Sequence, residues 1–288
     1  MAPEWLVERL QKARGGDPEA IAFTAAAAAL GAGEPQSWSL ALQRLVQAAE
    51  LGSASARGQL RVLADAEPEA RDWRALGAAV DWQAWLSPAP KGRLLSEPRI
   101  SASPDFLSGP ACAWLIGRAE GRIQQARVFD PVTGQSRVEP ERDNSAFEIG
   151  FADVDLVVLA VRARIAATVG MPTGALETPQ VLHYAPGQKF DRHYDFLDLD
   201  VPGYAADVAR RGQRVATFLI YLNEGYAAGE TDFPMVGLTH KGATGDALMF
   251  SNVDAAGRAD RRTLHAGLPP TAGEKWLFSQ WIRDRVST

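Results

Sequence analysis

Residues Gln180 to Asp195 read QVLHYAPGQKFDRHYD, and this stretch ends in an imidazole and a carboxylate two residues apart. In an extended strand, side chains at positions i and i+2 point to the same face. We therefore expect His193 and Asp195 to hold one metal ion from one face of a strand. A third ligand must come from another part of the chain.

Four histidines are present, so few residues can complete the set. His183 should face away from its neighbour Tyr184 if the segment is a strand. His240 lies in LTHKG, which reads as a surface turn, whereas His265 follows an apolar strand and a loop and precedes Lys275 by ten positions. Two histidines and one carboxylate leave half an octahedron open, which suits non-haem Fe(II) oxygenases.

The second half of the chain resembles the prolyl 4-hydroxylase type of Fe(II)/2-oxoglutarate dioxygenase. An isolated His-x-Asp is common by chance, but here an ordered series of motifs surrounds it. The matching residues are Glu177, Gln180–Tyr184, Pro186–Gln188, His193–Asp195, Arg214–Asn223, Gly229–Thr231, Gly245–Phe250, His265–Gly267, Gly273–Trp276 and Trp281–Arg283.

The resemblance implies that His193, Asp195 and His265 bind the iron. It also implies that Lys275 pairs with the distal carboxylate of the cosubstrate 2-oxoglutarate. The neighbours of Lys275 in the sequence are strongly apolar, and a lysine inside an apolar barrel needs an anion because an unpaired buried charge is costly. Alone on a strand, such a lysine would more often be a solvated surface cation.

Further cosubstrate contacts follow from the same resemblance. Tyr184 is expected to add a hydroxyl hydrogen bond, and Thr217 is a further candidate for one. Lys275 and Trp281 fall on one face of a strand by the period of two, so Trp281 is expected to line the same pocket. Ascorbate binding is a further expectation that comes from the family.

On the substrate side, Arg142 and Glu177 resemble residues with which the family positions its peptide. The alternative for these two residues is a structural Arg–Glu pair. Phe190 stands where the family often has a second tyrosine facing the target proline. The missing hydroxyl leaves cosubstrate binding untouched and leaves the identity of the substrate open. The segment Phe196–Gln213 reads as a mobile lid.

Composition narrows the class of protein. The chain has 288 residues, an ordinary apolar fraction of 46% and a net charge of −5, which gives no support to a general role at nucleic acids or membrane surfaces. No stretch is long and apolar enough for a membrane span, and the first residues lack the apolar core of a secretion signal. The single cysteine, Cys112, lies on an apolar helical stripe and predicts a buried thiol in a reducing compartment. We expect a cytoplasmic protein.

Residues 1–90 are predicted to be an all-α domain. Asp17-Pro18 is a helix-start signal and Gly31 a stop, and further helices are expected over 37–51 and 54–64. The segment 41–60 resembles a Sel1-like repeat, a relative of the tetratricopeptide hairpin. Such repeats normally stack in threes or more. A helical cap on the catalytic domain is therefore favoured over an arm that binds the protein substrate.

Residues 91–288 are predicted to form the dioxygenase domain, after a connector at 88–92. Helices are expected over 109–127 and 153–169, a strand and turn over 100–106, and another strand and turn over 127–134. From Glu177 onward short strands alternate with Gly, Pro and Asp clusters, which favours a sandwich or jelly roll. The resemblance sharpens this to a double-stranded β-helix, so the fold class is α+β.

The leading functional hypothesis is hydroxylation of a protein or peptide residue, prolyl first, with release of succinate and CO₂. Hydroxylation of a free amino acid or another small molecule is the alternative within the same chemistry. A non-catalytic binding module on the same fold is less consistent with an intact ligand triad and lysine. A zinc hydrolase using the same ligands would leave Lys275 without a role.

Overall fold

The computed structural model describes residues 3–130, 135–137, 142–201 and 203–286. The chain divides into two compact units, Met1–Ser87 with Phe151–Arg164, and Pro88–Gly150 with Ile165–Thr288. The expected domain division near residue 90 stays a prediction. The two units differ from it in one respect, because residues 151–164 belong with the N-terminal helices.

The first unit is helical, and its helices begin where capping residues stand. Asp17, Ser37 and Ser53 each accept a hydrogen bond from a backbone N–H in the first turn of the helix that follows. Gly31 ends its helix with a left-handed φ of 73°. The helices are α1 (Glu4–Arg14), α2 (Pro18–Leu30), α3 (Trp38–Glu50), α4 (Ala54–Leu63), α5 (Trp73–Ala79), α6 (Trp82–Leu86) and the first part of α8 (Leu156–Val169).

Alanines make the interior of this unit. Ala25, Ala41, Ala48 and Ala56 are fully buried, and such small side chains let neighbouring helices approach closely. The start of α8 is tied to the same unit, since Gln59 Oε1 accepts a hydrogen bond from the α8 backbone at 2.9 Å. The Sel1-like character of these helices stays a prediction.

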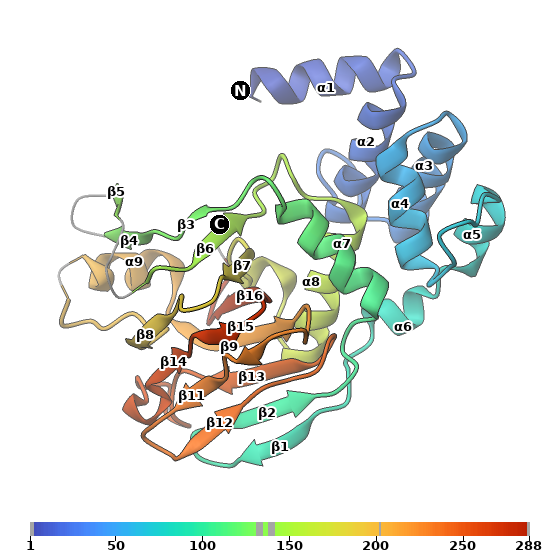
Figure 1. Ribbon diagram of the computed structural model, residues 1–288. Coiled ribbons are helices and arrows are strands. Elements are labelled where there is room, and N and C mark those ends of the chain that lie inside the picture. Colours follow the sequence, from blue (N-terminus) through green and yellow to red (C-terminus); the bar gives the residue numbers. More distant parts are fainter. Residues whose placement is uncertain (1–2, 131–134, 138–141, 202, 287–288) are drawn as a thin grey trace. The chain divides into compact units, whose positions relative to one another are not determined.

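The second unit is built on two antiparallel sheets (Figure 1). The larger has the order β1-β2-β13-β9-β16-β7-β6-β3, and the smaller has the order β12-β11-β14-β8. The strands of the larger sheet are β1 (Gly92–Leu95), β2 (Ile100–Ser103), β3 (Gln124–Gln125), β6 (Ser145–Glu148), β7 (Gln180–Tyr184), β9 (Arg214–Tyr221), β13 (Ala247–Ser251) and β16 (Lys275–Arg283). Those of the smaller sheet are β8 (Phe190–His193), β11 (Thr231–Phe233), β12 (Leu238–His240) and β14 (His265–Gly267). Two short pairs complete the set, β4 (Val128–Asp130) with β5 (Gln135–Arg137) and β10 (Ala227–Ala228) with β15 (Pro270–Ala272).

The core of this unit joins side chains from both sheets. Leu219, Phe250 and Leu277 of the larger sheet pack in one buried cluster with Phe233 of the smaller sheet. Strand β16 is buried along almost its whole length, including its polar residues Lys275 and Gln280. The predicted α+β class with a jelly-roll catalytic domain is confirmed.

Helix α7 (Gly109–Ala119) also packs on the larger sheet. Cys112 on α7 is fully buried, and its Sγ lies 4.0 Å from the carbonyl oxygen of Tyr221. Burial raises the pKa of this thiol to about 12, so the predicted buried and unreactive cysteine is confirmed. No helix in the described part of the chain is long and apolar enough to cross a membrane.

Three expected elements differ in the structure. The helix expected over 109–127 ends at Ala119, because Gly121 turns the chain with a φ of 71° toward β3. The helix expected from residue 153 begins at Leu156, where Asp155 Oδ1 accepts the N–H of Val158. His240 ends strand β12 rather than lying in a surface turn. The turn expected at 131–134 lies outside the described residues.

The expected lid, Phe196–Gln213, contains a helix, α9 (Tyr204–Arg211). Its two ends are fastened by one side chain: Gln213 Oε1 accepts the N–H of Leu197 at 2.7 Å, and Gln213 Nε2 donates to the Leu197 carbonyl at 2.8 Å. Asp198 is also paired with Arg261 at 2.8 Å. These contacts join the two ends of the segment to each other and its beginning to Arg261.

Candidate metal and cosubstrate site

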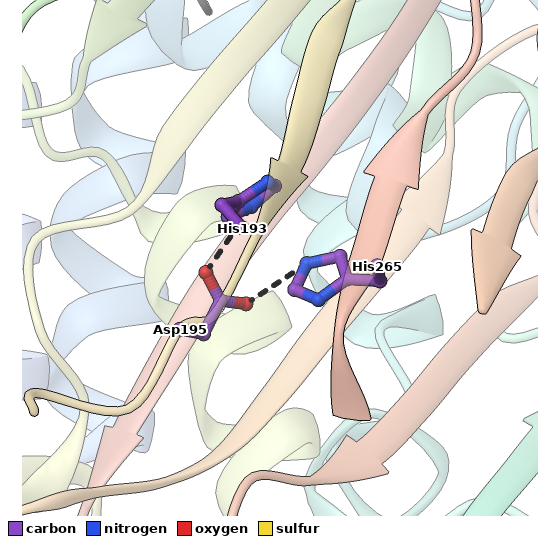
Figure 2. Close-up of side chains that lie close together, drawn as sticks. All are labelled: His193, Asp195 and His265. Carbon is purple, nitrogen blue, oxygen red and sulfur yellow. Dashed lines mark ion pairs between the residues drawn. The ribbon is translucent and has the colours of Figure 1, made fainter. Parts of the chain in front are cut away.

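Two histidines and an aspartate meet at the end of the smaller sheet (Figure 2). His193 on β8 and His265 on β14 face each other as partners across the two strands, and Asp195 follows β8 by two residues. His193 Nε2 lies 3.6 Å from Asp195 Oδ1, and His265 Nε2 lies 3.5 Å from Asp195 Oδ2. The ligand atoms of the three residues lie within 4.8 Å of one another, which suits one shared cation.

The backbone fixes which nitrogen of each histidine faces the shared point. The Nδ1 of His193 lies 2.7 Å from the carbonyl oxygen of Asp191, and that of His265 lies 3.0 Å from the carbonyl oxygen of Thr263. A carbonyl accepts only, so each Nδ1 carries the proton and donates it. Both Nε2 atoms are therefore free to bind a metal, as in protein sites where a second hydrogen bond orients the imidazole.

The charges of the triad are set by burial and by each other. Burial alone would raise the pKa of Asp195, but His265, His193 and the Thr217 hydroxyl outweigh it and hold this pKa well below its usual range. Burial and, to a smaller extent, the neighbouring His193 lower the pKa of His265 to about 4. The site therefore presents an ionised carboxylate and a neutral His265 imidazole near neutral pH, the protonation states that bind metals.

A chain of hydrogen bonds behind the triad orients Asp195. Thr217 Oγ1 lies 2.6 Å from Asp195 Oδ2, and Asn252 Nδ2 lies 3.0 Å from the same hydroxyl. The Asn252 amide can only donate, so the hydroxyl accepts from it and must give its single proton to Asp195. Thr217 is thus directed at the carboxylate rather than at the cavity where a cosubstrate contact was expected. Sequence reasoning missed Asn252, because an Asn after a strand looks like any turn residue.

Lys275 lies at the start of β16 and is fully buried. Its Nζ has no hydrogen-bond partner among the described residues, and it lies 5.0 Å from the centre of the Tyr184 ring. Burial lowers the pKa of Lys275 to about 7, and burial raises that of Tyr184 to about 12. A buried ammonium without a partner, beside a phenol that keeps its proton, is suited to receive a carboxylate.

The triad and Lys275 line one cavity between the two sheets. Its wall includes four alternate residues of β16: Lys275, Leu277, Ser279 and Trp281. The alternation of two therefore places Trp281 in the same cavity wall as Lys275, as the sequence pattern predicts. Gly267 in the opposite wall leaves room for Tyr184, since a Cβ there would lie 3.2 Å from the Tyr184 hydroxyl.

Phe190 and Arg142 form a stack on the open side of the triad. The Phe190 ring is parallel to the His193 imidazole at a centroid distance of 3.5 Å, and the Arg142 guanidinium lies 4.6 Å from the same Phe190 ring. Both Phe190 and Arg142 line the cavity. Phe190 therefore supports a metal ligand by apolar contact and offers no hydroxyl to a substrate.

Glu177 lies away from both the cavity and Arg142. Its carboxylate pairs with Arg214 at 2.7 and 2.9 Å and also with Arg283, and the Arg214 guanidinium stacks 3.7 Å from the Trp281 ring centre. The structural pair considered from the sequence thus exists, although its arginines are Arg214 and Arg283. The carboxylate acts on the cavity through Trp281.

The residues present fit Fe(II) and a dicarboxylate. Two neutral imidazoles and one carboxylate are the donor set of non-haem Fe(II) oxygenases, and they leave positions open for other ligands. The partnerless ammonium of Lys275 suits a carboxylate in the same cavity.

Known proteins carry the same pattern. The sequence profile of the 2OG-Fe(II) oxygenase superfamily matches residues 179–283. Prolyl 4-hydroxylase 1 of Arabidopsis thaliana is 32% identical over 205 residues, which are 66% of this chain and 71% of that protein. Prolyl 4-hydroxylase subunit alpha-1 of Rattus norvegicus is 32% identical over 201 residues, which are 69% of this chain and 37% of the subunit.

A solved structure is also similar, the viral collagen prolyl hydroxylase of Paramecium Bursaria Chlorella virus-1 in complex with 2OG. It is 28% identical with a TM-score of 0.48, and the match covers 64% of this chain and 95% of that one. The sequence matches and the donor set assign Fe(II) and 2-oxoglutarate to the site. The chain belongs to the Fe(II)- and 2-oxoglutarate-dependent dioxygenases of the prolyl 4-hydroxylase type.

Proposed function

We propose that this dioxygenase hydroxylates a prolyl residue of a protein or peptide. The observation that carries the proposal is the cavity that brings the His193–Asp195–His265 triad and Lys275 together. The relatives at 32% identity are named prolyl 4-hydroxylases, which gives the substrate class its support. With Fe(II) bound, one atom of O₂ enters a C–H bond of the substrate while the other enters succinate as 2-oxoglutarate loses CO₂.

The residues of the chain bind the cosubstrate and orient the metal ligands. Lys275 holds the distal carboxylate of 2-oxoglutarate by a charge-assisted hydrogen bond, and Tyr184 donates its phenolic proton to the same group. Leu277 and Trp281 add apolar surface to the same cavity wall. Thr217 holds Asp195 in one orientation, so the open side of the triad faces Phe190 and Arg142.

The test is a hydroxylation assay with enzyme loaded with Fe(II) and supplied with 2-oxoglutarate and O₂. Proline-containing peptides are expected to gain one oxygen atom on proline in the mass spectrum, with one succinate formed per hydroxylation. The matched control is His265→Ala, which removes one ligand and should abolish both products. If succinate forms but none of the proline-containing peptides is hydroxylated under any condition, the prolyl assignment is contradicted.

A free amino acid is the second candidate substrate. Arg142 favours it, because a buried guanidinium on the open side of the triad could take an α-carboxylate. Free proline in the same assay decides between the two, since a peptide hydroxylase leaves it unmodified.

We also propose that the N-terminal helices take part in recognition of a protein substrate. An open groove of about 340 Å³ between α3 and α5, walled by Leu42, Val46 and the Glu50–Arg74 pair, supports this proposal. Val46→Glu should then slow hydroxylation of a whole protein substrate but not of a short peptide. A variant that hydroxylates the whole protein substrate as fast as the wild type does would contradict this proposal.

The single cysteine supports a proposal that the enzyme works in the cytoplasm, a reducing compartment. Ascorbate use is proposed from the family alone. It predicts that added ascorbate prolongs succinate formation in the absence of substrate, and an unchanged time course would contradict it.

A further inference from the structure

Arg142 is a buried cation that forms no ion pair with any of the described residues. Arg142 is only 3% exposed. Its guanidinium donates hydrogen bonds to two neutral amides, to Asn144 Oδ1 at 3.2 Å and to Gln180 Oε1 at 3.1 Å. No carboxylate of the described residues forms an ion pair with it. A buried charge without a counter-ion is costly, so a group that arrives from outside is expected to neutralise it.

One acid in the surroundings of Arg142, Glu148, is committed to another partner. Glu148 accepts a hydrogen bond from Gln180 Nε2 at 2.8 Å, while the other end of the same amide accepts from Arg142. The Gln180 amide therefore lies between the Glu148 carboxylate and the Arg142 guanidinium and forms a hydrogen bond with each. The planar fork of arginine offers five N–H donors, and two amide contacts leave donors for a further partner.

Arg142 lies in the walls of two cavities at once. One is the inner cavity of the triad and Lys275, and the other is an outer cleft of about 530 Å³ bordered by β3, β6 and β7. A group bound to Arg142 therefore lies beside the metal site and reaches into the cleft.

The outer cleft has a charge opposite to that of the whole chain. Among the described residues, Arg122, Arg127 and Arg142 line it together with one carboxylate, Glu148, whereas the chain carries a net charge of −5. Gln124 and Gln125 add exposed amides at the sheet edge. A cleft with such an excess of guanidinium groups favours an anionic ligand over a cationic or apolar one.

On the basis of the proposed hydroxylase function, we propose that the substrate carries a carboxylate next to the carbon that is hydroxylated, and that Arg142 binds this carboxylate. An acidic side chain within two residues of the target proline supplies it in a peptide. The α-carboxylate of a free amino acid would supply the same chemistry, and the test separates the two sources. The enzyme then prefers prolines that have an acidic neighbour, because Arg142 binds the carboxylate of that neighbour.

The wild-type enzyme gives the first test, with peptides that differ only in Asp or Glu against Asn or Gln beside one proline. The acidic member of each pair should bind and react roughly ten- to a hundredfold better, the effect of one hydrogen bond to a charged group. Binding is measured by anisotropy of labelled peptides on enzyme loaded with Mn(II) and 2-oxoglutarate, and reaction by kcat/KM. Equal values for acid and amide peptides would overturn the proposal.

Variants assign the preference to a residue. Arg142→Gln should make acid and amide peptides equal, whereas Arg93→Gln, an exposed arginine on β1 at the opposite edge of the sheet, should keep the wild-type ratio. If Arg142→Gln does not fold, the double variant Arg122→Gln/Arg127→Gln decides. Both side chains are exposed, and a preference that survives their loss supports Arg142, whereas a preference abolished with them overturns its role.

Two further arms complete the design. Glu139 and Glu141 lie outside the described residues. The double variant Glu139→Gln/Glu141→Gln should keep the preference for acidic peptides. A large gain for amide peptides in this variant would show that the chain supplies its own anion to Arg142. Free proline tests the α-carboxylate as the source. Acid-selective binding without hydroxylation would contradict the proposed prolyl function alone, and hydroxylation without acid selectivity would contradict the Arg142 proposal alone.

Discussion

We expect the buried Lys275 to lower the stability of the unliganded protein and to bind the cosubstrate. Its ammonium is fully buried and has no hydrogen-bond partner in the described part of the chain. Lys275→Met keeps a similar volume and removes the buried charge, so the free energy of unfolding without ligands should rise by about 1–4 kcal/mol. Thermal unfolding should show this increase, and 2-oxoglutarate should no longer raise the Tm of the variant. A variant that is less stable than the wild type would contradict this account of Lys275.

The same residue predicts how cosubstrate affinity depends on pH. Burial lowers the pKa of Lys275 to about 7, and a bound carboxylate would raise it again. Below pH 7 the lysine is already charged, and the affinity should be flat with respect to this group. Above pH 7 binding must take up a proton, so the affinity should fall by about tenfold per pH unit.

Calorimetry in buffers of different ionisation enthalpy measures this uptake directly. About one proton should be taken up per 2-oxoglutarate at pH 8.5, and close to none below pH 6. In the unliganded protein the sign is also fixed: the unfolded chain holds this proton between pH 7 and the ordinary lysine pKa, so the Lys275 contribution to stability rises with pH in that window. Affinity independent of pH would show that Lys275 is not the anion partner.

At the scale of elements, three strands together position the carboxylate ligand of the metal site. Strand β8 leads to Asp195, β9 carries Thr217, and Asn252 follows β13. Thr217→Val keeps the shape of the side chain and removes the hydroxyl proton on Asp195, so the affinity for Fe(II) should fall about 10–100-fold. Thr217→Ser is the matched control and should bind like the wild type. Anaerobic metal titration reads the effect without turnover, and wild-type affinity in the Val variant would contradict it.

The end of β16 depends on Glu177. This carboxylate pairs with Arg214 of β9 and Arg283 of β16, and Arg283 also pairs with Asp207 of α9 at 3.0 Å. Glu177→Gln would leave two guanidinium groups without their shared anion, which should lower the free energy of unfolding by about 3–5 kcal/mol. Chemical denaturation measures this change. A loss of activity at unchanged stability would instead assign Glu177 to the substrate.

At the scale of the whole molecule, we expect the N-terminal helices to be needed for stable folding. The start of α8 belongs to the same unit as residues 1–87, and its residues Val157, Val158 and Val161 are fully buried. Deletion of residues 1–87 should therefore expose an apolar helix and give an aggregating or partly unfolded protein. Size-exclusion chromatography and calorimetry test this. A monodisperse fragment with normal 2-oxoglutarate turnover would contradict it.

Much of this molecule could be predicted from its sequence, and the exceptions have physical reasons. Motifs with fixed spacing, such as His193–Asp195 and the run from His265 to Lys275, predict β-strands because side chains alternate along a strand. Hydrogen bonds between distant strands leave no such signal, which is why Thr217 was expected at the cosubstrate and Asn252 was missed. The grouping of residues 151–164 with the N-terminal helices likewise depends on packing over a long sequence separation.

The most direct test of the central claim is anaerobic titration of the Fe(II) protein with 2-oxoglutarate, followed by visible absorption. The account predicts a charge-transfer band that saturates at one cosubstrate per chain, is absent in His193→Ala and needs far more cosubstrate in Lys275→Ala. Addition of O₂ to the wild-type sample should then yield succinate. A folded, iron-loaded protein that shows neither band nor succinate would contradict the dioxygenase site described here.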